Sequence, residues 1–274
     1  MNKISLVCAL LMFKPLAVCA EGGSCAPVDA NGNEIGSCRW SYDASTRTIS
    51  ITGTGDMKKY TNEKDTSGIW HTTAPWAVYE TEAESVNIAE GITSISTHAF
   101  YEMRAINNVS IPSSVISIGG GAFQNNNLTN VQIPEGVNSV GAATFHSNFN
   151  LTQVNLPNTL QVLDISAFGG TGIDSLILPE SVSTIRMNYN TNIKLYCTSA
   201  QMEQCKAVAQ ETGVEPIEYK KIQNGRYIAN GKQYLSAADL QAGNVFTPKL
   251  IYTVEEAMEA TKNGDKFHVY LTYK

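Results

Sequence analysis

A repeat of 22 to 23 residues runs through the middle of the chain and constrains its fold more than any other feature of the sequence. Phenylalanine, an aliphatic residue and proline each recur at this period, and all three keep one register. Their positions are Phe100, Phe123, Phe145 and Phe168; Val86, Val109, Val131, Val154 and Leu176; and Pro112, Pro134, Pro157 and Pro179. Three markers that agree over roughly four and a half copies indicate a repeat architecture, because chance would not hold them in step.

Each copy is predicted to form a strand, a turn, a second short extended segment and a helical turn. One copy reads Leu128-x-x-Val131-x-Ile133-Pro134, then Val137-x-x-Val140-Gly141, then Ala143-Thr144-Phe145. A single copy cannot bury its Val, Ile and Phe side chains, whereas stacked copies place each apolar residue above its counterpart. The pattern predicts a repeat solenoid with Phe145 in the core between Phe123 and Phe168. We interpret Gly119 and Gly141 as tight-turn residues.

Two stretches of the repeat resemble the BspA-type leucine-rich repeat, a family found on bacterial surface and secreted proteins. They are Asn87-Ile88-Ala89-Glu90-Gly91-Ile92-Thr93-Ser94-Ile95 with Ala99-Phe100, and Val109-Ser110-Ile111-Pro112-Ser113-Ser114-Val115 with Ala122-Phe123. The resemblance covers about residues 83–195 and implies a right-handed leucine-rich-repeat solenoid, with a strand plus turns in every 22–23 residues. Many family members carry a cysteine three residues after the repeat phenylalanine. This chain has Met103, Asn126, Asn148 and Thr171 there, so that inner ladder is expected to be polar or loosely packed.

Residues 21–82 are predicted to form an N-terminal β-hairpin cap. Two stretches, 39–42 and 48–52, alternate as strands around the turn at 43–47. A hairpin there would cover the apolar end of the first coil, which would otherwise expose core and strand edges. The stretch from Trp40 to Trp76 also resembles the cap that often precedes repeats of this family.

The residues after the repeat divide into two further segments. Residues 196–221 are expected to close the solenoid with a capping helix and a strand, the helix running from about Ser199 to Thr212 and ending at Gly213. Residues 222–274 are interpreted as a small α+β module. They contain a hairpin signal at Asn230-Gly231, a capping box that opens a helix at Thr253, and a final alternating strand over 267–273.

Residues 1–20 are interpreted as a signal peptide. Lys3 gives a short basic start, residues 4–13 are apolar, and Val18-Cys19-Ala20 is a small-residue site that predicts cleavage after Ala20. A buried first helix and a lipidated Cys19 are the alternatives. No apolar run is long enough for a membrane span, which needs about 20 residues. The chain is therefore expected to be secreted or on the cell surface, with the periplasm as the alternative.

Four cysteines remain after the signal peptide, and they are expected to form two disulfides. An even number of cysteines in an exported chain favours disulfide bonding. Proximity pairs Cys25 with Cys38 and Cys197 with Cys205, because each pair closes a short loop. A zinc site is the alternative, but the sequence has no Cys-x-x-Cys pair and no histidine near these cysteines.

The composition and motifs argue against several classes of function. The formal net charge is −6, and removal of residues 1–20 would leave 17 basic against 25 acidic residues. Nucleic acids and anionic membranes require a basic surface, so neither is an expected partner. The histidines are His71, His98, His146 and His268, and they do not fall into one ladder. The glycine-rich stretches 53–55 and 119–121 lack the Lys-Ser/Thr of a phosphate loop. We expect no catalytic, cofactor-binding or metal-binding residues, and no enzyme activity.

Two further sets of polar residues follow the repeat. Glu90, Glu135 and Glu180 recur beside the turn after the strand and are interpreted as solvated turn residues. Asn108, Asn127 and Asn150 each begin an N-glycosylation pattern. Modification requires a eukaryotic host, and the alternative is that the asparagines of this region are turn residues that bond to the backbone.

The strand residues between the apolar positions are predicted to face outwards as a binding surface, because side chains of a strand alternate. They are Asn107, Asn108, Ser110, Thr129, Asn130, Gln132, Thr152, Gln153, Asn155, Asp174, Ser175 and Ile177. Three of these four coils are uncharged and polar, which suits protein–protein or adhesion-type contact with a protein or glycan on a cell surface or matrix. One alternative is a merely soluble face. The other is an enzyme or a structural or anchoring protein whose activity lies in the C-terminal module.

Overall fold

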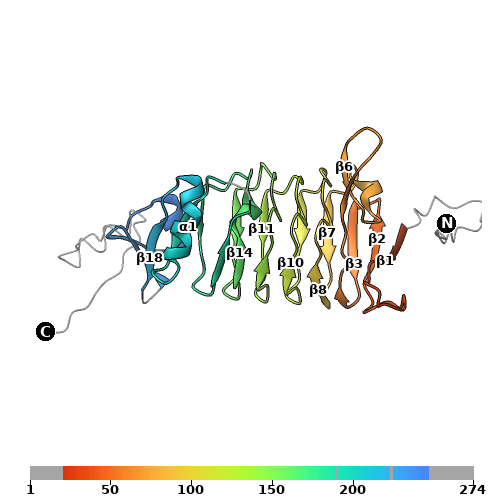
Figure 1. The fold of residues 1–274 in the computed structure, drawn as a ribbon, viewed down its shortest axis with the longest axis horizontal. Coiled ribbons are helices and arrows are strands. Elements are labelled where there is room, and N and C mark those ends of the chain that lie inside the picture. The colour runs from red at the N-terminus through yellow and green to blue at the C-terminus, as the bar shows by residue number, and fades with distance from the viewer. Residues whose placement is uncertain (1–20, 189–190, 223–224, 247–274) are drawn as a thin grey trace, which may run out of the picture. The chain divides into compact units, whose positions relative to one another are not determined.

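The computed structural model describes residues 21–188, 191–222 and 225–246. The predicted signal peptide, the helix at Thr253 and the strand over 267–273 lie outside the described residues. The chain divides into two compact units, with the boundary between Ile217 and Glu218. In the first unit the repeat coils lie side by side in a row (Figure 1).

The first strand of each coil contributes to what we call the first ladder. Its strands are β7 (Ser85–Ile88), β9 (Asn108–Ser110), β11 (Asn130–Gln132), β13 (Gln153–Asn155), β15 (Ser175–Ile177) and β17 (Lys194–Cys197). Parallel pairing joins β7 to β9, β11 to β13 and β15 to β17. The central aliphatic residue of each strand faces the core, so Val131 and Leu176 are buried while their neighbours face outwards.

The second extended segment of each coil forms a second ladder, which is a continuous parallel sheet. Its strands, in spatial order, are β4 (Gly55–Asp56), β8 (Ile92–Ile95), β10 (Ser117–Ile118), β12 (Ser139–Val140), β14 (Val162–Asp164) and β16 (Thr184–Arg186). Ile95, Ile118, Val140 and Leu163 are buried along its inner side. The strand, turn and second extended segment predicted for each copy are therefore present.

A ladder of aromatic rings fills the centre of the coils. Phe145 is fully buried and stacks between Phe123 and Phe168, with ring centroids 5.7 Å away on each side. The stack continues through Phe100 to Trp76, whose ring centroid lies 5.2 Å from that of Phe100. Trp76 lies in the segment predicted as the N-terminal cap, but its indole is the first rung of the ladder. Trp76 Nε1 also donates to the carbonyl of Ala99 in the next coil at 2.8 Å.

Left-handed backbone flanks the phenylalanine in successive coils. His98, Gly121 and Ala143 have φ of 53° to 61° two residues before it, and Glu102, Asn125, Ser147 and Gly170 have φ of 57° to 64° two residues after it. Gly119 and Gly141 do not adopt such a conformation, so tight turning does not explain them. A Cβ on Gly119 would lie 2.5 Å from the Thr97 backbone nitrogen, so glycine is present because the neighbouring coil approaches closely.

The inner ladder three residues after each phenylalanine is polar only in part, because Met103 is a buried apolar residue at the first of its four positions. Asn126 and Asn148 are buried there. The Asn148 side-chain amide donates to the carbonyls of Phe123 and Phe145, each at 2.8 Å, and its Oδ1 accepts from the Leu128 backbone N–H at 3.0 Å. This one side chain therefore joins neighbouring coils.

Two hairpins precede the first repeat coil. The strands β2 (Arg39–Asp43) and β3 (Thr48–Thr52) form the predicted hairpin, with β1 (Glu21–Ser24) on its far side, and β3 pairs in parallel with β7. The disulfide Cys25–Cys38 closes the loop that connects β1 to β2. A second hairpin, β5 (Asn62–Lys64) and β6 (Trp70–Thr72), was not predicted from the sequence. A short 3-10 helix, η1 (Ala77–Tyr79), follows it.

The predicted helix after the last coil is α1 (Met202–Thr212), which ends at Gly213 with φ 72°. It buries Cys205, which forms a disulfide with Cys197, and Ala209. In the second unit, β19 (Tyr227–Ala229) and β20 (Lys232–Tyr234) form the hairpin predicted at Asn230-Gly231, and β19 also pairs with β18 (Ile217–Lys221). The helix α2 (Ala237–Ala242), with Ser236 as its N-cap, was not predicted.

Candidate functional site

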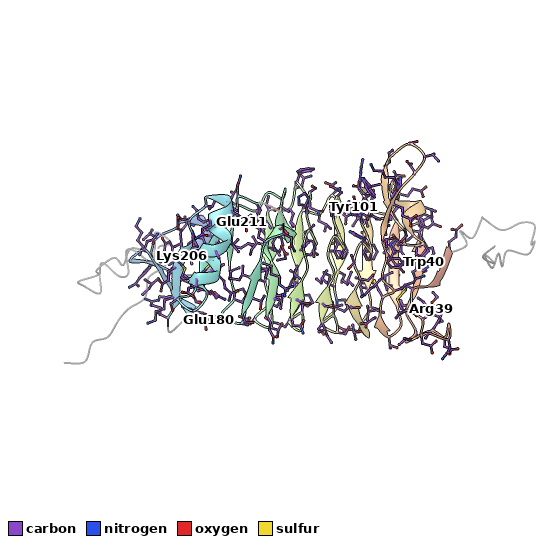
Figure 2. All side chains as sticks on the ribbon, in the orientation of Figure 1. Arg39, Trp40, Tyr101, Glu180, Lys206 and Glu211 are labelled. Atoms are coloured by element: carbon purple, nitrogen blue, oxygen red, sulfur yellow. A yellow bond between two sulfur atoms is a disulfide. The ribbon has the colours of Figure 1, made fainter. Side chains whose placement is uncertain are left out.

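The residues predicted as a binding surface lie together on the outer side of the first ladder, and we call these twelve residues the first-ladder face. Ten of them are exposed, while Ser175 and Ile177 are half-buried. Ile177 is the single aliphatic side chain of the set. Figure 2 shows the side chains that project from the coils.

Strand register aligns the residues of this face across β11 and β13. Asn130 lies opposite Gln153, and Gln132 lies opposite Asn155. Neighbouring strands are separated by about 4.8 Å, so amide side chains repeat at this interval. Each amide offers both donors and acceptors for hydrogen bonds. On β11 and β13 the arrangement forms a regular, uncharged surface capable of multiple hydrogen bonds, and Asp174 further along is the one charged residue of the face.

A groove crosses the outer side of the second ladder, and sequence reasoning did not identify it. Its volume is about 720 Å³, and we call it the second-ladder groove. Its floor contains Ser94, Ser117 and Ser139, while Lys58 and Lys59 line it near one end of the ladder and Arg186 near the other. The only available signal was the recurrence of serine two positions before Ser96, Gly119 and Gly141 in successive copies.

The turn glutamates do more than the sequence analysis proposed. Glu90 Oε1 accepts from the Ser113 backbone N–H and hydroxyl of the next coil, both at 3.0 Å. Glu135 Oε1 accepts from the backbone N–H of Asn158 at 3.1 Å and from its side-chain amide at 3.0 Å. These bonds hold the pKa of both carboxyl groups below the ordinary value. Interpreting Glu90 and Glu135 as merely solvated turn residues was therefore wrong, because they join neighbouring coils.

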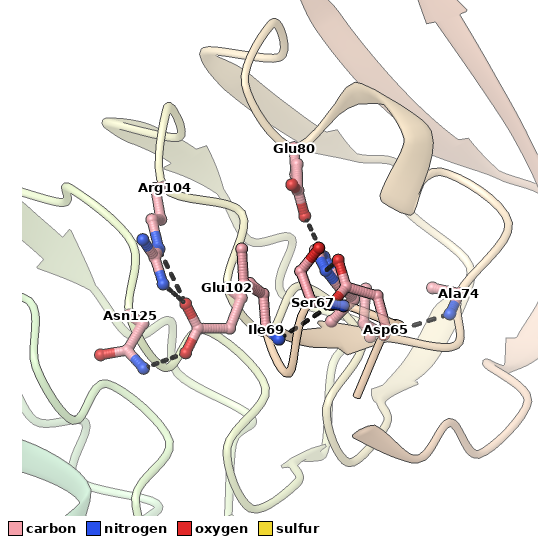
Figure 3. Close-up of polar contacts among 10 residues, drawn as sticks. Asp65, Ser67, Ile69, Ala74, Glu80, Glu102, Arg104 and Asn125 are labelled. Carbon is pink, nitrogen blue, oxygen red and sulfur yellow. Dashed lines mark hydrogen bonds and ion pairs between the residues drawn. The ribbon is translucent and has the colours of Figure 1, made fainter. Parts of the chain in front are cut away.

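Carboxylates on two sides hold His71 of β6. Its Nδ1 lies 2.6 Å from Glu80 Oε2, and its Nε2 lies 3.2 Å from Asp65 Oδ2 in the β5–β6 turn. The hydrogen bond to Glu80, and secondarily that to Asp65, raises the pKa of His71. Figure 3 shows Asp65 and Glu80 in this cluster. The contacts link the hairpin turn to the segment before the first coil.

A second polar cluster lies one coil further along. Glu102 is buried, forms an ion pair with Arg104 at 2.7 Å and accepts a hydrogen bond from the Asn125 side chain of the next coil (Figure 3). Glu102 therefore joins its own coil to the next one. Burial lowers the pKa of both His98 and His146.

Within residues 21–188, 191–222 and 225–246, no three histidine, cysteine or acidic side chains gather as a potential metal site. Over the same ranges, none of the helices has the length and apolar character needed to cross a membrane.

A row of coils with two parallel ladders and one aromatic rung per coil defines a repeat protein of the leucine-rich type. Residues 75–196 match the sequence profile of the BspA type leucine rich repeat region in six copies, and this part of the chain belongs to that family. The match begins upstream of residue 83, where Trp76 starts the aromatic ladder. A comparison with curated proteins found no match.

Several solved bacterial structures are similar to part of the chain. A leucine-rich repeat protein from Eubacterium ventriosum has 21% identity and a TM-score of 0.43, and the match covers 60% of this chain and 43% of that one. A leucine rich cell surface protein from Faecalibacterium prausnitzii has 21% identity and a TM-score of 0.39, with coverage of 72% and 61%. The pneumococcal vaccine antigen PcpA has 12% identity and a TM-score of 0.41, with coverage of 65% and 51%. The chain spans less than two thirds of the length of each.

Proposed function

We propose that this protein is a secreted or cell-surface binding protein whose first-ladder face contacts a protein or glycan on a cell surface or matrix. The observation that carries the proposal is the register of exposed amides on consecutive strands, such as Asn130 opposite Gln153. Stacked coils hold these side chains on a rigid support, so a partner meets a preorganised surface. The lack of charge on β9, β11 and β13 favours recognition by hydrogen bonds over electrostatic steering.

An oxidising location follows from the same proposal. Both disulfides of the structure require a compartment in which thiols are not kept reduced. A signal peptide cleaved after Ala20 would deliver the chain there, outside the cell or in the periplasm.

The solenoid is also proposed to be right-handed and capped at both ends. The β2–β3 hairpin buries Ile49 and Ile51 beside the first coil, which supports an N-terminal cap. In α1, the Gln204 side chain donates to the Ser183 carbonyl at 2.9 Å and accepts from the Ile185 backbone N–H at 2.9 Å, which supports a C-terminal capping helix. We propose that residues 222–274 form a separate module.

A pull-down from cell-surface and matrix extracts tests the binding proposal. Purified protein should retrieve a partner, and Asn130→Lys with Gln153→Lys should abolish retrieval because both introduce charge into the face. Glu180→Lys is the matched control, since Glu180 is an exposed turn residue with no hydrogen-bond partner among the described residues. Retrieval that is unchanged in the double variant would overturn the first-ladder face as the binding surface.

A further inference from the structure

The outward positions of the second ladder hold Val162 and Asp164 in the coil of β14, whereas the three preceding coils hold small side chains there. In successive coils they are Ser94 and Ser96, Ser117 and Gly119, and Ser139 and Gly141. The same coils project Asn and Gln from their other strand. The small residues leave the hollow of about 720 Å³ that runs across the ladder.

Coil packing accounts for the glycines of this floor but not for its serines. A Cβ at position 119 or 141 would lie 2.5 Å or 2.7 Å from a backbone nitrogen of the neighbouring coil. The hydroxyls of Ser94, Ser117 and Ser139 have no hydrogen-bond partner within the described part of the chain, and pairing places the three serines in one row. The groove therefore presents a line of unused donors and acceptors.

The two ends of the groove carry cations that have no carboxylate partner. Lys58, Lys59 and Arg186 form no ion pair with any residue that the structure describes. The two acids of the lining are otherwise engaged. Asp56 accepts from the Thr93 hydroxyl at 2.7 Å, and Asp164 is buried and accepts from the Ser166 backbone N–H at 3.0 Å. In a chain of formal net charge −6, the end of the groove at Lys58 and Lys59 thus has a local excess of positive charge, whereas at the other end Arg186 lies opposite Asp164 in the strand pairing.

The spacing of the ladder selects a class of ligand. Adjacent strands are about 4.8 Å apart, so the five steps from β4 to β16 span about 24 Å. An extended chain of pyranose rings advances by a similar length per ring, whereas an extended polypeptide advances only about 3.3 Å per residue and falls out of step with the serines. Sugar hydroxyls and serine hydroxyls both donate and accept hydrogen bonds.

We propose that the second-ladder groove binds an extended acidic oligosaccharide. Its rings lie along the serine row, one ring to a coil, and its carboxylates meet Lys58 and Lys59 at one end and Arg186 at the other. This site is on a different ladder from the first-ladder face and does not depend on the function proposed for that face.

Calorimetric titration of the full chain with an oligogalacturonate as long as the groove tests the proposal. A neutral malto-oligosaccharide of equal length and a poly-glutamate peptide are the comparison probes. We expect the oligogalacturonate to bind, the neutral oligosaccharide to bind at least tenfold more weakly, roughly the effect of one charge-assisted contact, and poly-glutamate not to bind. Poly-glutamate that binds as well as the oligogalacturonate would overturn the proposal, as would equal binding of the neutral sugar or no binding of either sugar.

Variants on the two ladders locate the site. Lys59→Ala and Arg186→Ala should each weaken oligogalacturonate binding about tenfold, and Ser117→Leu should abolish it by filling the floor. Lys194→Ala removes an equivalent charge from the first ladder and should leave the affinity unchanged, as should Asn130→Lys. If Lys194→Ala weakens the affinity for oligogalacturonate as much as Lys59→Ala does, the proposal is overturned. The two alanine variants at exposed positions keep the test decisive if Ser117→Leu fails to fold.

Discussion

At the scale of single residues, the buried polar ladder shows how a coil tolerates asparagine in its core. Asn148 uses both ends of its amide, since its nitrogen donates to two carbonyls and its oxygen accepts from the Leu128 backbone. Asn126 donates in the same way to Phe100 and Met103, but its Oδ1 has no partner among the described residues. A buried acceptor without a partner is destabilising. Asn126 should therefore contribute less to the free energy of unfolding than Asn148, although both occupy the same position of the repeat.

Truncation of the central aromatic rung should be strongly destabilising. Phe145→Ala removes a fully buried ring that is held between two others, and the loss should be about 3–5 kcal/mol in the free energy of unfolding. Chemical denaturation monitored by circular dichroism measures it. Phe149→Ala is the control, since the Phe149 side chain is 73% exposed. An unchanged midpoint for Phe145→Ala would show that the stacked ladder is wrong.

The contact of Glu135 with the next coil should make the free energy of unfolding fall at acidic pH. Because the pKa of Glu135 is lower in the folded chain than its ordinary value of 4.5, the stabilisation is present above that value and is lost as pH falls through the folded pKa. Glu135→Gln should therefore be less stable than the wild type at neutral pH, and the difference should shrink in acid. Thermal melts of wild type and Glu135→Gln across the acidic range test this, and a difference that stays constant down to the most acidic pH would contradict the contact.

At the scale of elements, the β5–β6 hairpin is attached to the repeat coils by individual side-chain contacts. The β5–β6 hairpin lies outside the periodic region, yet the Thr72 hydroxyl donates to the His98 carbonyl at 2.6 Å. Its turn is held by the bridge from Asp65 through His71 to Glu80. The same hairpin exposes Ile69 and Trp70.

Because of this bridge, the local stability of the β5–β6 hairpin should fall as pH rises. Folding raises the pKa of His71, so the stabilisation is fully present below the ordinary value of 6.5 and is lost as pH rises through the folded pKa. Amide exchange of residues 62–72, corrected for its intrinsic pH dependence, should show protection falling as pH rises above the ordinary pKa of 6.5 and through the raised folded pKa. In His71→Gln the protection should be lower at the acidic end and flat across the range; a wild-type profile that is equally flat would refute the bridge.

At the scale of the whole molecule, the two disulfides lie in the segments that flank the repeat coils of the first unit. Cys25–Cys38 precedes the coils and Cys197–Cys205 joins β17 to α1. Loops this short restrict the unfolded chain and should each contribute about 2–3 kcal/mol to stability. Repeat proteins are stabilised by neighbour contacts, so their terminal coils are the ones that lack a partner on one side.

Exported protein should contain these two disulfides and no free thiol. Non-reducing peptide mapping should recover Cys25 linked to Cys38 and Cys197 linked to Cys205. A peptide that links Cys25 to Cys197 or Cys205 would contradict the pairing. Four titratable thiols would contradict both the pairing and the oxidising compartment.

The sequence by itself determined the coil, because a 22 to 23 residue period of Phe, Val and Pro requires stacking to bury its apolar side chains. It also determined the β2–β3 hairpin, the extent of α1 to within a few residues, and the pairs of cysteines, since these depend on local pattern and proximity. Only the tertiary structure decided that Trp76 heads the aromatic ladder, that Glu135 reaches the next coil, and that a groove crosses the second ladder. Those features depend on which side chains of different coils meet across strand spacings, and on where residues 25–60 fold against the coils. A repeat period specifies that coils stack, but the contacts between them depend on the individual side chain at each aligned position.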